Sequence, residues 1–275
     1  MTIANELTHL RQPAVAGSFY PDDPAELRAL LAKLLNNKLT GNTPMPKALI
    51  APHAGYIYSG PIAATAYARL RSLRERIKQV VLLGPSHRVP MQGLATSTAE
   101  AFQTPLGFVP LDQTALATLR NLPQVKALEQ AHAQEHSLEV QLPFLQTLLA
   151  AFSLVPLVVG EASAEEVCEV LECVWGGPET LLVISSDLSH YHNYQTAQMM
   201  DQVTCQAIEA LRGQDIDYEQ ACGRVPLQGL LLAAQKHGLQ VETLDLRNSG
   251  DTAGPRHQVV GYGAWALHDA AHDHA

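Results

Sequence analysis

Apolar positions follow two periods along the chain, and the period separates predicted helices from predicted strands. In residues 21–37, PDDPAELRALLAKLLNN, leucines at positions 27, 30, 31, 34 and 35 have the spacing of one helix face. Asp23 can cap this helix, Pro24 suits its first turn, and Glu26 completes a capping-box pattern. Similar reasoning predicts further helices over 59–70, 135–152, 164–175, 194–213 and 226–238. We expect the second of these to break near Pro143.

Short continuous apolar runs lie between these helices and predict strands. They cover residues 48–52, 80–84, 154–160, 180–186, 240–247 and 258–267. Strands without polar alternation are buried on both faces, so their alternation with helices indicates an α/β sheet covered on both sides. We therefore predict one α/β domain over residues 1–275 with a mostly parallel or mixed central sheet. Residues 269–275 are expected to form a frayed tail.

Composition narrows the class of protein without identifying it. The 275 residues are 47% hydrophobic and 16% charged, which fits a packed core and argues against disorder. A net charge of -9 with scattered Lys and Arg argues against a nucleic-acid surface. No apolar run approaches the roughly 20 residues of a membrane span, and the first residues lack a signal pattern. The four cysteines form no CxxC pair, so we expect a cytoplasmic protein with reduced thiols and no membrane partner.

Three of the predicted strands run into a histidine. KALIAPH ends on His53, QVVLLGPSH on His87 and TLLVISSDLSH on His190. Ligands of open α/β sheets bind beyond the carboxyl ends of parallel strands, so neighbouring strands would bring these three rings to one edge. Each histidine alone could be an ordinary loop residue. The recurrence favours a shared pocket.

The segment QEHSLEVQLP adds His136 and Glu139 to the candidates. On a helix, residues three apart share a face, so both side chains could form a wall of the same pocket. The alternative is a solvated helix start with an acidic first turn. Asp187, three residues before His190, is a further candidate.

This set of residues suits a metal site. Two imidazoles and a carboxylate with open positions are the facial arrangement of non-haem Fe(II) oxygenases, and Zn²⁺ with three nitrogen or oxygen ligands is the competing interpretation. An unligated histidine could transfer a proton, because imidazole titrates near neutral pH. The chain has no HExxH, GxSxG or P-loop motif.

Several longer strings carry a family resemblance. They are RQPAVAGSFYP, APHAGYIYSGPIAATAY, LLGPSH, TPLG, EHSLEVQLPFLQ, SSDLSHYH and GYGAWAL. In this order they resemble the Memo family, whose bacterial members are often labelled component B of the AmmeMemoRadiSam system. The family is similar to class III extradiol (LigB-type) dioxygenases, which implies a three-layer αβα sandwich with a metal pocket at the strand ends. It also implies radical-SAM and AMMECR-type partner proteins.

The resemblance assigns roles to individual residues. His53 and His87 match the two metal-binding histidines, and His190 matches the acid/base histidine of the dioxygenases. The third ligand is a glutamate in the dioxygenases and a cysteine in the animal Memo protein. An ungapped alignment places Thr252 there, with Asp251 adjacent.

The remaining candidate roles are those of the pocket wall. We take His136 and Asp187 as further catalytic candidates beside His190. Glu139, Tyr56 and Ser86 are taken as substrate-binding candidates.

Function stays divided between two main hypotheses. One is a metal-dependent, oxygenase-type enzyme that uses Fe²⁺, with Zn²⁺ or Cu as alternatives, on a small aromatic or activated-carbonyl substrate. The other is a binding or adaptor protein that uses the same pocket for a peptide, a metal or a partner subunit. Metal-assisted hydrolysis is a third and weaker reading.

Overall fold

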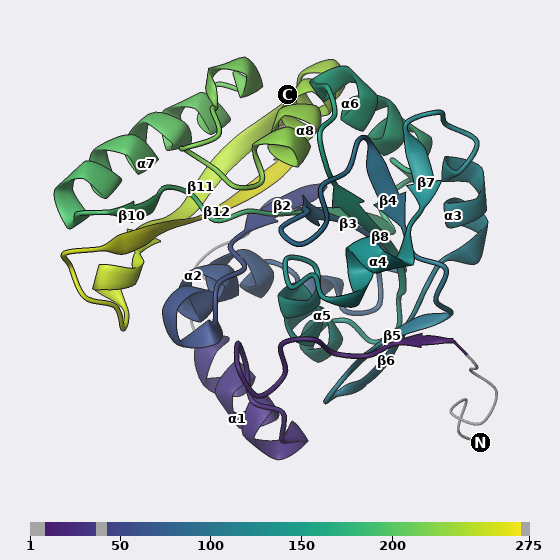
Figure 1. The fold of residues 1–275 in the computed structure, drawn as a ribbon, viewed down its shortest axis with the longest axis horizontal. Coiled ribbons are helices and arrows are strands. Elements are labelled where there is room, and N and C mark those ends of the chain that lie inside the picture. The colour runs from purple at the N-terminus through teal and green to yellow at the C-terminus, as the bar shows by residue number, and fades with distance from the viewer. Residues whose placement is uncertain (1–8, 37–42, 271–275) are drawn as a thin grey trace, which may run out of the picture.

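A nine-stranded mixed sheet forms the centre of the computed structural model, which describes residues 9–36 and 43–270 (Figure 1). Its four central strands are parallel neighbours and almost wholly buried. In spatial order they are β2 (Ala48–Ala51), β9 (Thr180–Ser185), β3 (Gln79–Pro85) and β8 (Ser153–Val159). Parallel neighbours end at one edge, so the expected meeting of strand ends is present.

Antiparallel pairs extend this parallel centre on both sides. On the β2 side lie β12 (Val259–Asp269), β11 (Leu239–Asn248) and the short β10 (His190–His192). On the β8 side lie β4 (Leu94–Thr96) and β7 (Val125–Ala127). A separate small sheet contains β1 (Leu10–Arg11), β5 (Ala101–Thr104) and β6 (Gly107–Pro110).

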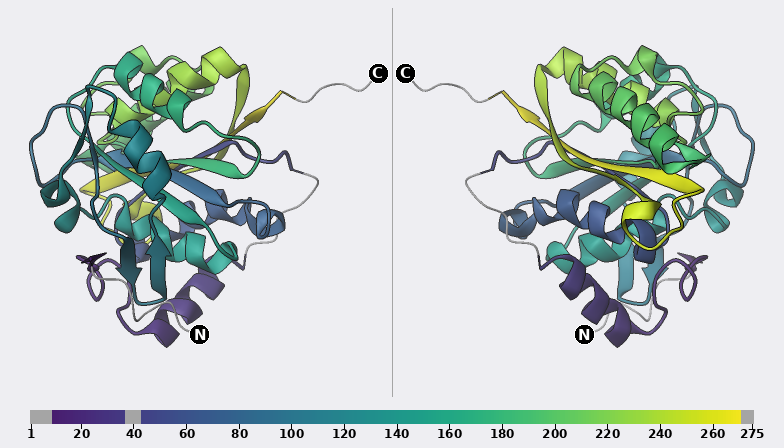
Figure 2. Two further views of the ribbon diagram at one scale, coloured as in Figure 1. Left: turned by 90° about the vertical axis from the view of Figure 1, so that its right-hand side faces the viewer. Right: turned by 90° about the vertical axis from the view of Figure 1, so that its left-hand side faces the viewer.

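Helices cover both faces of the large sheet, which gives the predicted three-layer αβα sandwich (Figure 2). One face carries α6 (Ala164–Cys173), α7 (Tyr194–Glu209) and α8 (Arg224–His237). The other carries α1 (Pro24–Leu34), α2 (Tyr56–Ala68) and α5 (Leu142–Leu148). The short α3 (Gln113–Leu119) and α4 (Glu129–Ala133) lie toward the β7 side (Figure 1). The described residues also form the single 3-10 turns η2 (Arg71–Leu73), η3 (Glu139–Gln141), η4 (Gly213–Asp215) and η5 (Ser249–Asp251).

The start of α1 follows the sequence pattern. Asp23 Oδ1 accepts hydrogen bonds from the backbone N–H groups of Ala25 (2.8 Å) and Glu26 (2.9 Å). Pro24 occupies the first turn, where no N–H is needed. Leu27 and Leu31 are fully buried on the inner face. The capping residue and the leucine spacing together therefore determine this helix.

Two predicted helices differ from the observed ones. The helix expected from residue 59 begins at Tyr56, because the Tyr56 N–H bonds to the Phe19 carbonyl (2.8 Å) and Gly55 caps the turn. Pro61 therefore lies inside α2. Residues 135–152 do not form one helix. They form a turn, then η3 and α5, and Pro143 lies in the first turn of α5.

β12 continues through Asp269, so the first residue of the expected tail belongs to a strand. The rest of that tail, residues 271–275, lies outside the described residues. Across residues 9–36 and 43–270, no helix combines the length and apolar character needed to span a bilayer.

Candidate metal centre

The carboxyl ends of the parallel strands bring the predicted side chains together. His53 follows β2, His87 follows β3 and Asp187 follows β9, each by two residues. β2 and β3 both pair with β9, so the three strand ends are neighbours. His190, the first residue of β10, lines the same cavity. The predicted convergence is confirmed.

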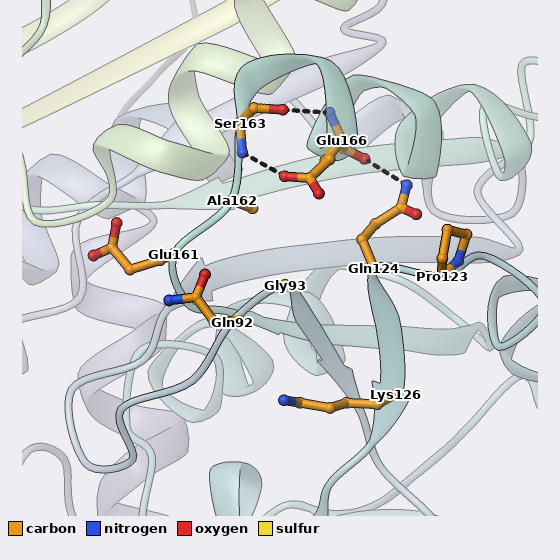
Figure 3. A pocket seen from close by; sticks show the side chains of 9 residues that line it. All are labelled: Gln92, Gly93, Pro123, Gln124, Lys126, Glu161, Ala162, Ser163 and Glu166. Atoms are coloured by element: carbon orange, nitrogen blue, oxygen red, sulfur yellow. Dashed lines mark hydrogen bonds between the residues drawn. The ribbon is translucent and has the colours of Figure 1, made fainter.

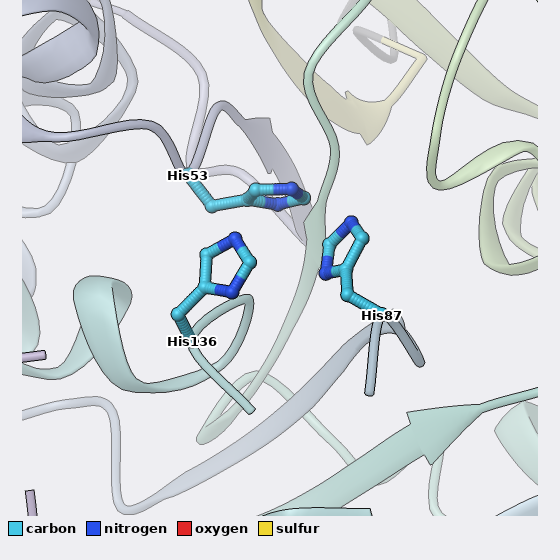
Figure 4. A group of neighbouring side chains, drawn as sticks. All are labelled: His53, His87 and His136. Atoms are coloured by element: carbon cyan, nitrogen blue, oxygen red, sulfur yellow. The ribbon is translucent and has the colours of Figure 1, made fainter. Parts of the chain in front are cut away.

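Three imidazole rings form the core of the site (Figure 4). The ring centroid of His53 lies 5.1 Å from that of His87 and 5.4 Å from that of His136. The His87 and His136 rings are stacked with their centroids 4.6 Å apart. One ligand atom from each of the three residues lies within 4.8 Å of the others. This group could hold a metal ion, since three imidazole nitrogens suit Zn²⁺, Cu, Fe or Ni.

Buried hydrogen bonds fix the tautomer of His53. Its Nδ1 lies 2.9 Å from Ser185 Oγ, whose own proton goes to the Ser137 carbonyl (2.5 Å). Gln141 Nε2 also donates to Ser185 Oγ (2.8 Å). Ser185 Oγ has only one proton, so His53 Nδ1 must be the donor. The lone pair of His53 Nε2 is therefore available to the cluster.

Glu135 fixes His87 and the turn that carries His136. Its Oε1 accepts from His87 Nδ1 (2.8 Å) and from the backbone of His136 (3.0 Å) and Ser137 (2.9 Å). Its Oε2 accepts from the His87 backbone (2.6 Å). A carboxylate only accepts, so His87 Nδ1 carries a proton and Nε2 is free. His136 Nδ1 lies 3.4 Å from Oε1 and is buried without a hydrogen-bond partner among the described residues.

Burial controls the protonation of the site. It lowers the pKa of His53 and of His136, and neighbouring histidines add to this effect, so both rings favour the neutral form that binds metal. Burial also raises the pKa of Asp187, against a hydrogen bond from the His53 backbone. Burial would raise the pKa of Glu135 too, but hydrogen bonds from His87 and Ser137 outweigh it and hold the pKa at about 2.

Two open chambers reach the cluster. The larger has a volume of about 710 Å³ and is lined by His53, His136, Asp187 and a wall that includes Phe19. The Phe19 ring lies 4.9 Å from that of His136. The second chamber, about 510 Å³, shares His87, His190 and Tyr191 with the first and adds His192, Tyr218, Glu219 and Cys222. The predicted acid/base residue, His190, thus faces both chambers.

The expected third ligand lies elsewhere. Asp251 Oδ1 accepts from the Tyr194 hydroxyl (2.5 Å), and Oδ2 accepts from the Asn248 backbone (3.0 Å). Thr252 Oγ1 donates to the Ser249 carbonyl. Neither residue lines the histidine cavity. The ungapped alignment therefore selected a capped turn at the end of β11, and His136 takes the third place in the cluster.

Three other assignments also need correction. Glu139 is fully buried and points away from the cavity toward Arg11, because a turn at residues 137–138 separates His136 from η3, which begins at Glu139. The Tyr56 hydroxyl donates to the Val140 carbonyl (2.6 Å) beneath the site. Ser86 Oγ donates to the Val89 carbonyl (2.6 Å) and lines a different depression. None of the three lines the histidine chambers, so we no longer expect them to bind substrate.

The structure adds residues that the sequence did not single out. Cys222 Sγ lies 3.3 Å from His53 Nε2 and accepts from the Asp187 backbone (3.3 Å). Ser185 and Glu135 hold the rings of His53 and His87, as described above. Position after a strand could have suggested Ser185, and adjacency to His136 could have suggested Glu135. The cysteine precedes α8 and carries no signal of this kind in the sequence.

Another depression, of about 560 Å³, lies beside α6 and β7 (Figure 3). Several of its polar groups are already paired: Ser163 and Glu166 cap each other, and Gln124 donates to the Glu166 carbonyl. Glu161 forms an ion pair with Arg224. None of the predicted site residues lines it, so it offers no competing centre.

Comparisons with known proteins agree with this fold and the motifs. The crystal structure of the uncharacterized protein JW3007 from Escherichia coli K12 matches with a TM-score of 0.54 and 15% identity, over 81% of this chain and 99% of that one. This likeness supports the fold alone.

Sequence relatives extend over almost the whole chain. A MEMO1 family protein of Aquifex aeolicus is 37% identical, over 92% of this chain and 97% of its own length. A MEMO1 family protein of Metallosphaera sedula is 33% identical, over 94% and 99%. The family described as "Memo-like protein" matches residues 11–266. The chain therefore belongs to the Memo family.

Proposed function

We propose that this protein binds one divalent transition-metal ion, Fe²⁺ in its working state, and catalyses an oxygenase-type reaction on a small molecule. The observation that carries the proposal is the three-histidine cluster, whose ligand atoms lie within 4.8 Å of one another. His53 and His87 present unprotonated Nε2 atoms, and His136 Nδ1 is buried without a hydrogen-bond partner in the described part of the chain. This donor set also accepts Zn²⁺ or Cu, which metal analysis distinguishes.

When bound, the ion would supply a Lewis-acidic centre with coordination positions open to substrate. The chain's own residues supply binding and proton transfer. Phe19 and Tyr191 flank the larger chamber, where a planar substrate can lie against them. His190 faces both chambers and is placed to give or take a proton at substrate. Asp187 connects the segment after β9 to the segment after β2, because its Oδ1 accepts from the His53 backbone N–H (2.7 Å).

The first prediction tests the ligand set. After anaerobic purification we expect one metal ion per chain in the wild type and loss of that metal in the combined His53→Ala and His87→Ala variant. His136→Ala should also lose metal. Asp251→Ala is the matched control and should keep it, because that carboxylate caps a turn. Elemental analysis of the four proteins gives the answer.

A further variant, analysed for metal and assayed for turnover, separates a metal ligand from an acid/base residue. His190→Ala should keep its metal and lose turnover of a candidate substrate, since a general acid or base contributes typically ~10²–10⁴-fold. Equal metal in the wild type and the double variant would show that the cluster is not the site. Metal lost on His190→Ala would make His190 a ligand.

A binding role is the second candidate, and one observation favours it. Exposed hydrophobic side chains surround the chamber mouths, among them Ile57 (68% exposed), Tyr191 (68%) and Tyr218 (77%). Such groups mark interaction sites when they gather at a cavity. A peptide, or a radical-SAM or AMMECR-type partner, would contact this rim. In that case the combined His53→Ala and His87→Ala variant would still bind its partner.

A further inference from the structure

The side chain of Tyr262 projects from β12 toward the larger histidine chamber. Gly261, the residue before it, faces α7, because a Cβ at that glycine would meet the Asp201 carboxylate. Successive side chains of a strand point to opposite faces of the sheet, so Tyr262 lies on the α2 side, where α2 packs on β12. There it lines the chamber, although its exposed fraction is 2%.

The Tyr262 hydroxyl differs from those of the other buried tyrosines in the described part of the chain. Tyr262 Oη has no hydrogen-bond partner among the described residues, yet it is not sealed from solvent as the unpaired Trp265 Nε1 is. Its partner must therefore come from the contents of the chamber. The other buried tyrosines donate to protein oxygens: Tyr20 to Glu139 Oε1 (2.5 Å), Tyr56 to the Val140 carbonyl (2.6 Å) and Tyr67 to Gln141 Oε1 (2.8 Å).

The surroundings make this hydroxyl a neutral donor. Burial, followed by the charge of Asp187, raises the pKa of Tyr262, so the phenol keeps its proton at neutral pH. Among the described residues, no Lys or Arg lines the chamber. A carboxylate or phosphate bound at Tyr262 would thus find no ammonium or guanidinium group beside it. A carbonyl oxygen needs one donor and no counter-charge, so it matches this hydroxyl.

Aromatic side chains favour a flat ligand. Phe19 and Tyr191 line the same chamber, and the Phe19 ring packs on that of His136. Planar rings stack well on such side chains. The chamber volume of about 710 Å³ is ordinary for a small-molecule site. A ring that fills it displaces solvent from Tyr262, and it loses affinity unless it replaces that hydrogen bond.

We propose that the Tyr262 hydroxyl donates a hydrogen bond to the carbonyl oxygen of an uncharged, planar ring compound in the larger chamber. The paired strands β11 and β12 hold this donor in place, with Tyr262 opposite Arg247. A ring without an acceptor leaves a buried hydroxyl unpaired, so Tyr262 selects against it. This inference rests on the proposed use of the chamber for a small molecule, and it does not require the metal ion.

Unfolding measurements test whether the hydroxyl lacks a partner inside the protein. Tyr262→Phe should keep or raise the urea midpoint, because it removes no bond within the protein. Tyr67→Phe is the matched control and should lower the midpoint, since it leaves the buried Gln141 Oε1 without its donor. An equal fall in both variants would overturn the proposal, because it would show that the Tyr262 hydroxyl is bonded within the protein.

A pair of matched probes tests the ligand chemistry. Indanone and indane are flat bicyclic compounds that differ in one position, a carbonyl in the first and a methylene in the second. NMR titration of the full chain, dialysed against EDTA, gives both dissociation constants. The preference for indanone over indane should fall about tenfold in Tyr262→Phe, since one neutral hydrogen bond is lost. Tyr58→Phe is the control and should keep the preference, because it removes a hydroxyl from a chamber residue that is 39% exposed.

The outcomes separate this inference from the proposed metal chemistry. An unchanged preference in Tyr262→Phe would overturn the inference, and so would failure of indanone to bind the wild type. Metal analysis of Tyr262→Phe should give the wild-type content, because Tyr262 is not a ligand of the cluster. A wild type that holds no metal but shows the expected change in preference would remove the metal chemistry and support the role of Tyr262. A metal-loaded wild type with an unchanged preference in the variant would do the reverse.

Discussion

His53 and His87 offer their Nε2 lone pairs to the cluster because their Nδ1 protons are committed to buried acceptors. Ser185 holds the one and Glu135 the other. Such outer partners set the tautomer and orientation of a metal-binding imidazole. Glu135 also holds the backbone of His136 and Ser137, so one carboxylate positions two of the three rings.

Glu135→Gln should therefore weaken metal binding without removing a ligand. The amide keeps an acceptor for His87 Nδ1 but loses the charge, and outer partners of this kind are typically worth about 10–100-fold in metal affinity. Calorimetric titration of metal-free protein with Zn²⁺ measures the change. Glu129→Gln is the control, because Glu129 accepts similar hydrogen bonds from Ser97 and Thr98 away from the cluster. Equal affinity in both variants would remove Glu135 from the centre.

At this scale the sequence revealed the histidines of the cluster better than the residues that support them. His53 and His87 each end an apolar run, so local pattern was enough to find them. The partner of His87 lies 48 residues away, on a turn whose position depends on the whole fold. Asp251 and Thr252 were chosen by alignment without a gap, and a one-turn cap at that point removed both from the cavity.

At the scale of elements, the N-terminal loop is held to the site by one buried acid. Glu139 forms an ion pair with Arg11 and accepts from the Tyr20 hydroxyl (2.5 Å) and the Ala14 backbone (2.7 Å). The same loop carries Phe19, which packs on His136. Glu139 therefore shapes the cavity wall from behind without entering the cavity.

Glu139→Ala should lower the free energy of unfolding by about 3–5 kcal/mol, because it removes the carboxylate that neutralises the buried Arg11 charge. Urea denaturation measures the loss. Asp215→Ala, which removes an exposed pair with Arg212, is the control and should cost at most about 1 kcal/mol. A similar small loss of unfolding free energy in both variants would contradict the role of Glu139 in holding the N-terminal loop. Amide exchange in residues 14–20 should rise only in Glu139→Ala.

Elements with a long apolar pattern were predictable, and short ones were not. The strands of the parallel centre and helices α1, α6 and α8 follow runs that periodicity detects. The stretch from β4 to α4 consists of strands of three or four residues and helices of five or seven, too short to show a period. The failure at 135–152 has a different cause. The Glu135 carboxylate accepts from the backbone of His136 and Ser137 and also from distant His87, and this long-range contact holds a turn where the leucine spacing favours a helix.

At the scale of the whole molecule, packing sets protonation states that no local pattern shows. Asp201, on the inner face of α7, is 3% exposed beneath Gly261 of β12. Burial raises its pKa from 3.8 to about 6, although the Ser189 backbone donates to it. His132 is buried on the other side of the sheet, and burial lowers its pKa from 6.5 to about 4. Both groups titrate over similar pH ranges with opposite effects on stability.

The sign for Asp201 can be tested by comparing the wild type with Asp201→Asn. Between pH 3.8 and about 6 the folded carboxyl keeps a proton that the unfolded one has lost. Its contribution to stability is complete below 3.8 and disappears as pH rises through 6, by about 3 kcal/mol in all. Asparagine does not titrate and still accepts from Ser189. The free energy of unfolding of Asp201→Asn minus that of the wild type should thus increase as pH rises from 3.8 to about 6. Above that range the difference should stay constant. The contribution of His132 to stability is lost as pH falls from 6.5 to 4 in both proteins, so it cancels in this difference. Urea unfolding at pH 4, 5, 6 and 7 measures the difference, and a constant value across the series would show that folding does not raise the pKa of Asp201.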